Sequence, residues 1–204
     1  MRRTKEDAEL TKQAILNAAV EVFSHRGVAK ASLEEIARKA DVTRGAVYWH
    51  FKNKMEIFDA LHERLHTPFI ERILEGLEAE HPNPIGQLQV LCTNLLLELD
   101  QDEFRKKSLT LFMLKCDYSG ALQDRRDAHT KAKYEKMQAF SGYFQKAIEA
   151  GQLPSNADAG DYTIAMNCYI RGIIIEYLEA PDAFDMPNKA PILMDIFFSR
   201  LQHT

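Results

Sequence analysis

A group of polar and aromatic residues between positions 32 and 54 has the chemistry to contact nucleic acid. The guanidinium of Arg44 presents N–H donors in a planar fork that matches the two acceptors on a guanine edge. Gly45, beside it, would let the backbone come close to a duplex. The residues that can hold phosphates, directly or through their backbone N–H groups, are Ser32, Thr43, Tyr48, Trp49, His50 and Lys54.

Two short helices joined by a tight turn are predicted to present these groups. Ser32 is an N-cap candidate, and Glu35 three residues later completes a capping box. Thr43 caps a second helix of less than two turns. The apolar residues at helical spacing are Leu33, Ile36, Ala37, Ala40, Ala46 and Val47, with Phe51 closing the small core. The order predicts a helix-turn-helix whose second helix enters the DNA major groove, although the spacing alone also fits an ordinary helical hairpin.

The segment LEEIARKADVTRGAVYWHFKNKMEIF resembles the signature of the TetR family of bacterial transcriptional regulators. The resemblance is dense over residues 10–60 and rests on an Ile-Ala pair, a Tyr-aromatic-His-Phe block and the Lys after it. The chain departs at Asp41, where the family usually has Gly, but an Asx residue tolerates a left-handed turn. Residues MRRTKEDA, LKCDY and Arg171-Gly172 resemble the AcrR-, TtgR- and MtrR-like regulators of multidrug efflux pumps.

The length and composition exclude several other classes of protein. The 204 residues suit one or two domains. The sequence contains no run of 18 apolar residues, so no membrane span is predicted. The N-terminus is charged and no apolar stretch follows it, so no signal peptide is expected. Three cysteines without metal-ligand spacing, Cys92, Cys116 and Cys168, indicate a reducing cytosol and hence a cytoplasmic protein.

The net charge of −4 would not by itself indicate a DNA-binding protein, but its distribution does. Residues 1–54 carry 11 basic and 7 acidic side chains, a net of +4, and the remainder carries 15 and 23, a net of −8. A basic end can approach a polyanion while an acidic body stays away from it. We therefore expect a DNA-binding domain over residues 1–54 and a helical ligand-binding and dimerisation domain over residues 55–204.

The helical periodicity predicts an all-α fold of about nine helices. Residues 1–8, with Arg2, Arg3 and Lys5, form either a mobile basic arm or a frayed terminus. The first helix is expected over residues 9–26, with Gly27 as its stop. Asn53 caps the next helix, which is kinked or broken at Pro68. Further helices are expected over residues 84–100, 102–116, 121–150, 158–179 and 188–202.

The size of the second part calls for a function beyond DNA reading. Asn167 and Arg171 lie one turn apart on a helix that is apolar on most sides, and a buried Arg171 would need an acidic partner, solvent or a ligand. The alternative is that these residues are core with Arg171 in a salt bridge. The resemblance implies a drug site between the fourth and eighth helices. A separate alternative, which the sequence leaves open, places Arg171 at the dimer face. The candidate lining residues are His66, Phe69, Ile70, Ile73, Leu109, Phe112, Met113, Tyr134, Met137, Asn167, Ile170, Arg171 and Ile174.

An enzyme is not indicated. The sequence has no G-x-S-x-G elbow, phosphate-binding glycine loop or H-E-x-x-H motif. His62 and His66 are spaced to share a metal, but no third ligand is evident, so no metal or other cofactor is expected. A purely structural helical scaffold remains the other class, although it would not need the Tyr48-Trp49-His50 block.

These observations predict a ligand-responsive repressor that binds a palindromic double-stranded operator as a homodimer. Arg44 would read a base and the other residues of the 32–54 segment would hold phosphates. The last two helices would form the dimer, or alternatively only close the core of one chain. By the resemblance, an apolar or cationic drug-like compound would act as the inducer, and the regulated gene would be a multidrug efflux operon.

Overall fold

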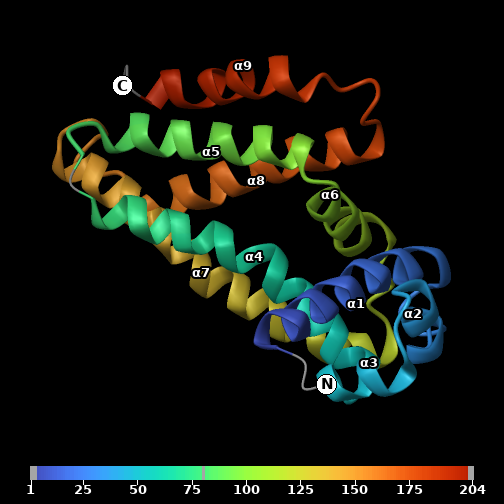
Figure 1. The fold of residues 1–204 in the computed structure, drawn as a ribbon. Helices are drawn as coiled ribbons and strands as arrows, with labels where there is room; N and C mark the ends of the chain where they lie inside the picture. Colours follow the sequence, from blue (N-terminus) through green and yellow to red (C-terminus); the bar gives the residue numbers. More distant parts are fainter. Residues whose placement is uncertain (1–3, 80, 202–204) are drawn as a thin grey trace. The chain divides into compact units, whose positions relative to one another are not determined.

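The computed structural model describes residues 4–79 and 81–201, and these residues form α-helices and short 3-10 or π turns without a strand (Figure 1). The predicted all-α class with about nine helices is confirmed. The elements in chain order are α1 (Lys5–Arg26), α2 (Leu33–Lys39), α3 (Arg44–His50), α4 (Lys54–Glu78), α5 (Pro84–Gln101), α6 (Glu103–Thr110), the π turn η1 (Leu111–Lys115), the 3-10 turn η2 (Gly120–Leu122), α7 (Gln123–Glu149), α8 (Ala159–Glu179), α9 (Met186–Phe198) and the 3-10 turn η3 (Ser199–Leu201).

The chain divides into two compact units. The first runs to Thr67 and also contains Glu103–Asp117, and the second contains Pro68–Asp102 and the chain from Tyr118 onward. α4 continues through the boundary as a single helix with Pro68 in its interior. The sequence had left open whether this helix breaks at Pro68, and the structure shows that it does not.

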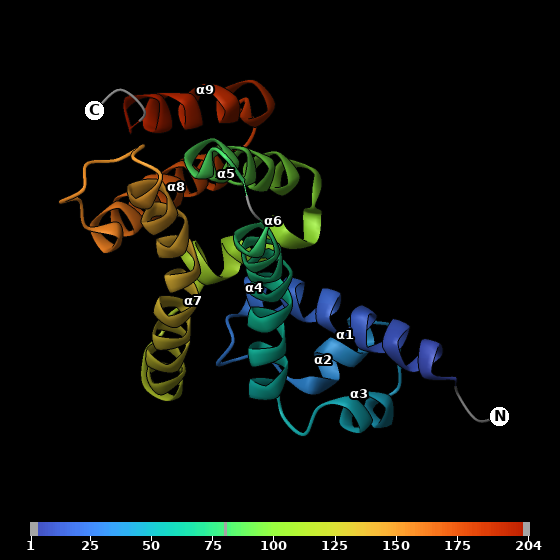
Figure 2. The ribbon, with the colours of Figure 1, turned by 90° about the vertical axis from the view of Figure 1, so that its left-hand side faces the viewer.

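The first unit is built around α1, which contacts α2, α3, α6 and η1 (Figure 2). Ile15 and Ala19 of α1 are completely buried, and the ring of Phe23 lies 6.4 Å from that of Phe58 on α4. The Phe58 ring in turn meets Phe112 of η1 at 5.1 Å in an edge-to-face arrangement. This apolar cluster joins the N-terminal helices to the first half of α4.

The helix ends of the first unit follow the predicted chemistry closely. The hydroxyl of Ser32 accepts a hydrogen bond from the backbone N–H of Glu35 at 3.2 Å, and the Glu35 carboxylate accepts one from the Ser32 N–H at 3.0 Å. Gly27 ends α1 with φ 74°. Asp41 has φ 53°, so it adopts the left-handed conformation that the turn requires.

The start of α1 corrects one expectation. The hydroxyl of Thr4 caps the helix by accepting from the N–H of Asp7 at 3.1 Å, so α1 begins at Lys5 and residues 5–8 are helical. The predicted mobile arm therefore does not extend over residues 4–8. Arg2 and Arg3, which were to form its basic part, lie outside the described residues.

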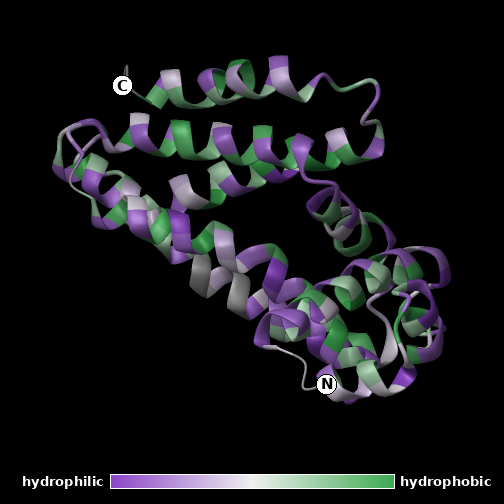
Figure 3. Cartoon of the chain, viewed as in Figure 1, coloured by the Kyte–Doolittle hydropathy of each residue, from purple (hydrophilic) through white to green (hydrophobic). Residues whose placement is uncertain are grey.

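In the second unit, α5 packs beside α9 and contacts α7, and α7 packs against α8. Figure 3 shows hydrophobic and hydrophilic residues alternating along α5 and α9, as expected for helices with one buried side. Leu88 and Leu96 of α5 and Met194 and Phe198 of α9 are completely buried. The Tyr177 hydroxyl on α8 donates to the carboxylate of Asp100 at 2.9 Å, so this buried side chain has its polar partner.

The C-terminal part of α4 is held by the side chains of other helices in the second unit. Tyr143 of α7 donates to the carbonyl of Ile73 at 2.9 Å, and Gln87 of α5 donates to that of Gly76 at 2.7 Å. Gly76 leaves room for the Tyr143 hydroxyl, which would lie 2.4 Å from an added Cβ. Reciprocally, a Cβ at Gly142 of α7 would lie 2.6 Å from the Leu77 side chain. Each helix thus places a side chain over a glycine of the other.

The left-handed conformation of Asp41 predicts the effect of substituting it. Asp41→Gly should raise the free energy of unfolding by up to about 1 kcal/mol because glycine adopts positive φ without steric strain. Asp41→Val should lower it by roughly 1–2 kcal/mol because a β-branched residue is strained there. Thermal and urea unfolding of the three proteins measures both effects. A glycine variant less stable than the original would mean that the Asp41 carboxylate makes a contribution larger than the backbone strain.

Candidate functional site

The short helix α3 presents the predicted DNA-contacting residues on its exposed side. Val47 is fully buried and anchors the helix, while the hydroxyl of Thr43 caps it by accepting from the N–H of Ala46 at 3.1 Å. Arg44, Gly45, Tyr48 and Trp49 are exposed and His50 is half-buried. The Trp49 side chain is 73% exposed, which is unusual for so large an apolar ring in a folded protein.

The guanidinium of Arg44 is held in place on this surface. Its Nη1 forms an ion pair with Oε1 of Glu34 on α2 at 2.7 Å, and its Nη2 donates to the Tyr48 hydroxyl at 3.3 Å. The guanidinium carbon also lies 5.3 Å from the centre of the Tyr48 ring. The hydrogen bond to Tyr48 and then the negative charge of Glu34 raise the pKa of Arg44 above its ordinary value.

Lys54 and Ser32, both predicted to hold phosphates, also maintain the fold of the first unit. The Lys54 ammonium donates to the backbone carbonyls of Ala29 and Ala31, the second at 3.0 Å. It therefore fixes the loop between α1 and α2 to the start of α4. The Ser32 hydroxyl takes part in the capping box of α2. Their contacts with phosphate stay predictions, but Lys54→Ala is not a clean test of phosphate binding because it also removes two bonds within the protein.

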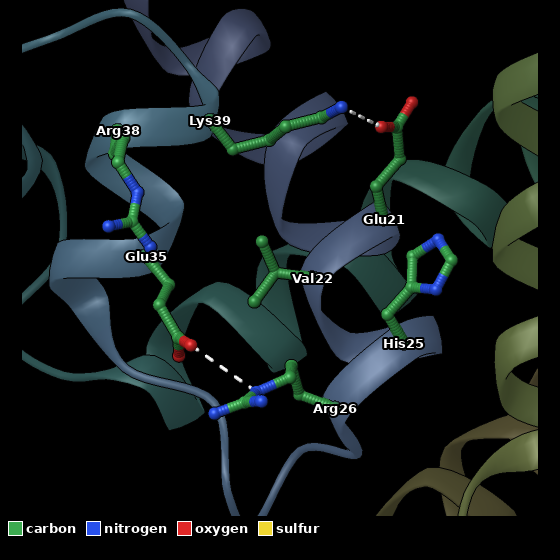
Figure 4. Close-up of a pocket in the computed structure, with 7 residues that line it drawn as sticks. All are labelled: Glu21, Val22, His25, Arg26, Glu35, Arg38 and Lys39. Carbon is green, nitrogen blue, oxygen red and sulfur yellow. Dashed lines mark ion pairs between the residues drawn. The ribbon is translucent and has the colours of Figure 1, made fainter.

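A cleft of about 400 Å³ between α1 and α2 contains an ion-pair network that the sequence did not predict (Figure 4). Glu21 lies 2.6 Å from Lys39 of α2 and 2.9 Å from Lys107 of α6. Across the cleft, Arg26 lies 3.3 Å from Glu35. The hydrogen bonds from Lys39 and then Lys107 lower the pKa of Glu21 to about 2. This carboxylate links three helices of the first unit.

Four of the predicted ligand-site residues lie in the first unit. The ring of Phe112 on η1 meets that of His62 on α4 at 5.4 Å, and the rings of His62 and His66 are 4.3 Å apart. Leu109, Phe112, Met113 and His66 are half-buried. The π turn at residues 111–115 is notable because such insertions into a helix often occur at functional sites.

The remaining nine candidates lie in the second unit. The ring of Phe69 on α4 lies 5.6 Å from that of Phe140 on α7. Ile73, Met137 and Ile170 are buried, and Ile70, Phe69, Asn167 and Ile174 are half-buried. Arg171 and Tyr134 are exposed, so the argument from the energetic cost of burying Arg171 does not apply. That these residues form one ligand site stays a prediction.

Within the described residues no group of three or more His, Cys, Asp or Glu side chains is placed to hold a metal ion. In the same part of the chain, no helix is long and apolar enough to cross a membrane.

Residues 15–61 match the family described as bacterial regulatory proteins, tetR family, and residues 83–203 match the C-terminal region of MAATS-type transcriptional repressors. The chain belongs to the TetR family. This family consists of transcriptional regulators, so the capped α2–turn–α3 unit of this TetR-family chain is a DNA-binding helix-turn-helix, and the chain is a transcriptional repressor.

Relatives of this TetR-family repressor match it over nearly its whole length. It is 33% identical to the HTH-type transcriptional regulator TtgR of Pseudomonas putida over 91% of the chain and 89% of the relative. It is also 33% identical to AcrR of Shigella flexneri, over 93% and 88% respectively. Both relatives belong to the AcrR-, TtgR- and MtrR-like subgroup that the sequence predicted, so the predicted subgroup is confirmed.

Solved structures give the same result. SmeT is the repressor of a Stenotrophomonas maltophilia multidrug efflux pump. Its structure in complex with triclosan superposes on this chain with a TM-score of 0.80 and covers 94% of this chain and 91% of SmeT. The two sequences are 28% identical. The structure of NalD from Pseudomonas aeruginosa is 32% identical with a TM-score of 0.77 over 96% and 97%. NalD is the secondary repressor of the MexAB-OprM multidrug efflux pump.

The ion pairs of Glu21 predict how the stability of the repressor depends on pH. Because the pKa of Glu21 is lowered in the folded state from 4.5 to about 2, its contribution is complete above pH 4.5 and is lost as the pH falls toward 2. Glu21 is about one-third exposed, so solvent screening limits the effect to about 1 kcal/mol or less. The stability difference between the original protein and Glu21→Gln should therefore shrink between pH 6 and pH 3.

The control for this measurement is Glu9→Gln, which removes an exposed carboxylate of the same helix that accepts a hydrogen bond from a neutral side chain, that of Gln13. Its effect on the free energy of unfolding should be smaller at pH 6. A difference between the original protein and Glu21→Gln that stays constant with pH would contradict the role assigned to Glu21.

Proposed function

We propose that this repressor controls a multidrug efflux operon, binds its palindromic operator as a homodimer and is released by an apolar or cationic drug-like compound. The observation that carries the proposal is the exposed, oriented Arg44 on a capped recognition helix, in a chain whose relatives over about nine-tenths of its length include named efflux-pump repressors. Residues 1–54 would serve DNA binding, and residues 55–204 would serve the ligand and the dimer. The site of action would be the cytoplasm.

DNA recognition divides between base reading and phosphate binding. Arg44 would contact a guanine edge, and Gly45 would allow the close approach. Tyr48, Trp49 and His50 lie on the same short helix as Arg44, Thr43 caps it, and these four residues would hold the flanking phosphates. The exposed indole of Trp49 supports this assignment, because contact with a duplex would cover it.

A homodimer is supported by the small size of α3 and by exposed apolar residues on the last two helices. Seven residues read too few base pairs for useful specificity, whereas two copies related by a two-fold axis read two half-sites. Ile164 on α8 and Ile192 and Ile196 on α9 are each more than half exposed. We expect the second copy to cover these residues, so that the protein–operator complex contains two chains for each palindrome.

The response to a ligand would be carried by α4. This helix begins four residues after α3 ends, and its residues belong to both compact units. The two copies of α3 must lie about 34–36 Å apart to enter successive major grooves. A compound that displaces α4 would change this separation. A shift from about 1:99 to 99:1 requires that it bind the displaced state more tightly by about 5.5 kcal/mol.

The assigned role of Arg44 predicts a change in sequence preference. Arg44→Ala should weaken operator binding by roughly 1–3 kcal/mol for each half-site and relax the preference at one base pair. The operator is first obtained by selecting genomic fragments on the protein, and each base pair is then varied in turn. The matched control is Arg38→Ala, which removes the same charge from α2 and should leave the base preferences unchanged. Retained preferences in Arg44→Ala would exclude Arg44 as the base-reading residue.

The proposed switch predicts reciprocal coupling between drug and operator. Triclosan, chosen because SmeT is known in complex with it, should weaken operator binding by the same factor by which the operator weakens triclosan binding. Titration calorimetry with triclosan, in the presence and absence of the operator, measures this factor. Tight triclosan binding that the operator leaves unchanged would show a ligand site without a switch. If triclosan does not bind, the same titration is repeated with a cationic dye.

A further inference from the structure

The partner of Arg44 on α2 needs an explanation. Glu34 lies in the first turn of α2, and its carboxylate is 59% exposed beside a guanidinium that is 61% exposed. An ion pair as exposed as this one adds little to stability because solvent screens it. The carboxylate also carries the same sign of charge as a DNA backbone, so its presence opposes DNA binding in general. As a first-turn acid, Glu34 also favours the N-terminus of α2, but this contribution does not require Arg44 beside it.

The adjacent carboxylate on α2 shows that a structural role is not needed at position 34. Glu35 completes the capping box with Ser32 and also pairs with Arg26. Glu34 takes no part in the cap, and its ion-pair partner is Arg44. Replacing the Glu34 carboxylate by an amide therefore leaves the cap of the helix intact.

The geometry leaves Arg44 able to read a base while it is held. The guanidinium has five N–H donors, of which one faces Glu34 and one bonds to the Tyr48 hydroxyl. Among the residues that the structure describes, the other three have no partner, and a guanine edge requires two. Glu34 and Tyr48 thus hold the planar group through one N–H each and leave three N–H donors, one more than a guanine edge requires.

We propose that Glu34 is a specificity-determining residue that positions Arg44 for a base edge and withholds it from phosphates. An unpaired arginine on this surface would bind the phosphates of any sequence. The paired arginine gains less from a phosphate, because the Glu34 carboxylate repels the phosphate and occupies one N–H donor, whereas the remaining donors stay available to a base edge. The inference rests on the proposed function, since it assumes that Arg44 faces the operator.

The test compares Glu34→Gln with the original protein on the selected operator and on a duplex of random sequence. The random duplex should bind several-fold more tightly to the variant, with the salt dependence of log K steeper by about 0.9, corresponding to one more phosphate contact. The ratio of operator to random-duplex affinity should fall by about the same several-fold factor. Glu71→Gln, an exposed carboxylate of α4 in the second unit, changes the net charge equally and should leave the ratio unchanged.

The same substitution in the Arg44→Ala background distinguishes positioning from a general charge effect. If Glu34 acts through Arg44, Glu34→Gln should not alter the affinity ratio once Arg44 is absent. An equal change in both backgrounds, or an unchanged ratio in the original background, would overturn the proposal. Failure of the original protein to bind any selected fragment with a salt-dependent affinity would instead refute the proposed function. Glu34→Ala serves as a second variant, and thermal unfolding confirms that each protein is folded.

Discussion

The seven residues of α3 are too few to remain helical by themselves, since isolated helices shorter than about 12–15 residues are marginal in water. The position of the recognition helix therefore depends on what surrounds it. Val47 is completely buried, Thr43 caps the N-terminus, and Phe51 is buried immediately after the last turn. Because these three residues hold the helix in place, its exposed side chains are not needed for its stability and are available for contact with DNA.

Polar contacts then fix the other elements of the first unit to one another. Lys54 at the start of α4 bonds to two carbonyls of the α1–α2 loop, and Glu21 of α1 binds lysines of α2 and α6. The same residue types that would hold DNA phosphates therefore also hold the protein together. A lysine in this unit cannot be assigned to DNA from its charge alone, because its ammonium can be engaged by the backbone.

The local features of the fold could be predicted from the sequence, whereas contacts between distant residues could not. Ser32, Thr43, Gly27 and Asp41 act within four residues of their partners, so their spacing identifies the caps and the turn. Glu21 and Lys107 are 86 residues apart, and no periodicity links them. Arg44 was assigned from its type, but the Glu34 beside it depends on how α2 crosses α3. The exposure of Arg171 similarly depends on which side of α8 faces the core. Because α8 is apolar on most sides, its sequence alone does not identify that side.

The paired glycines of α4 and α7 limit the kind of motion open to the second unit. Tyr143 lies over Gly76 and Leu77 over Gly142, so each helix is locked in register with the other. Sliding by one helical turn, about 5.4 Å, would bring side chains against side chains where glycines now leave space. Sliding of residues 73–78 of α4 along α7 is therefore opposed by steric clashes. These residues are expected to move together with α7, and Pro68, which cannot donate a backbone hydrogen bond, is the weakest point of the α4 hydrogen-bond ladder.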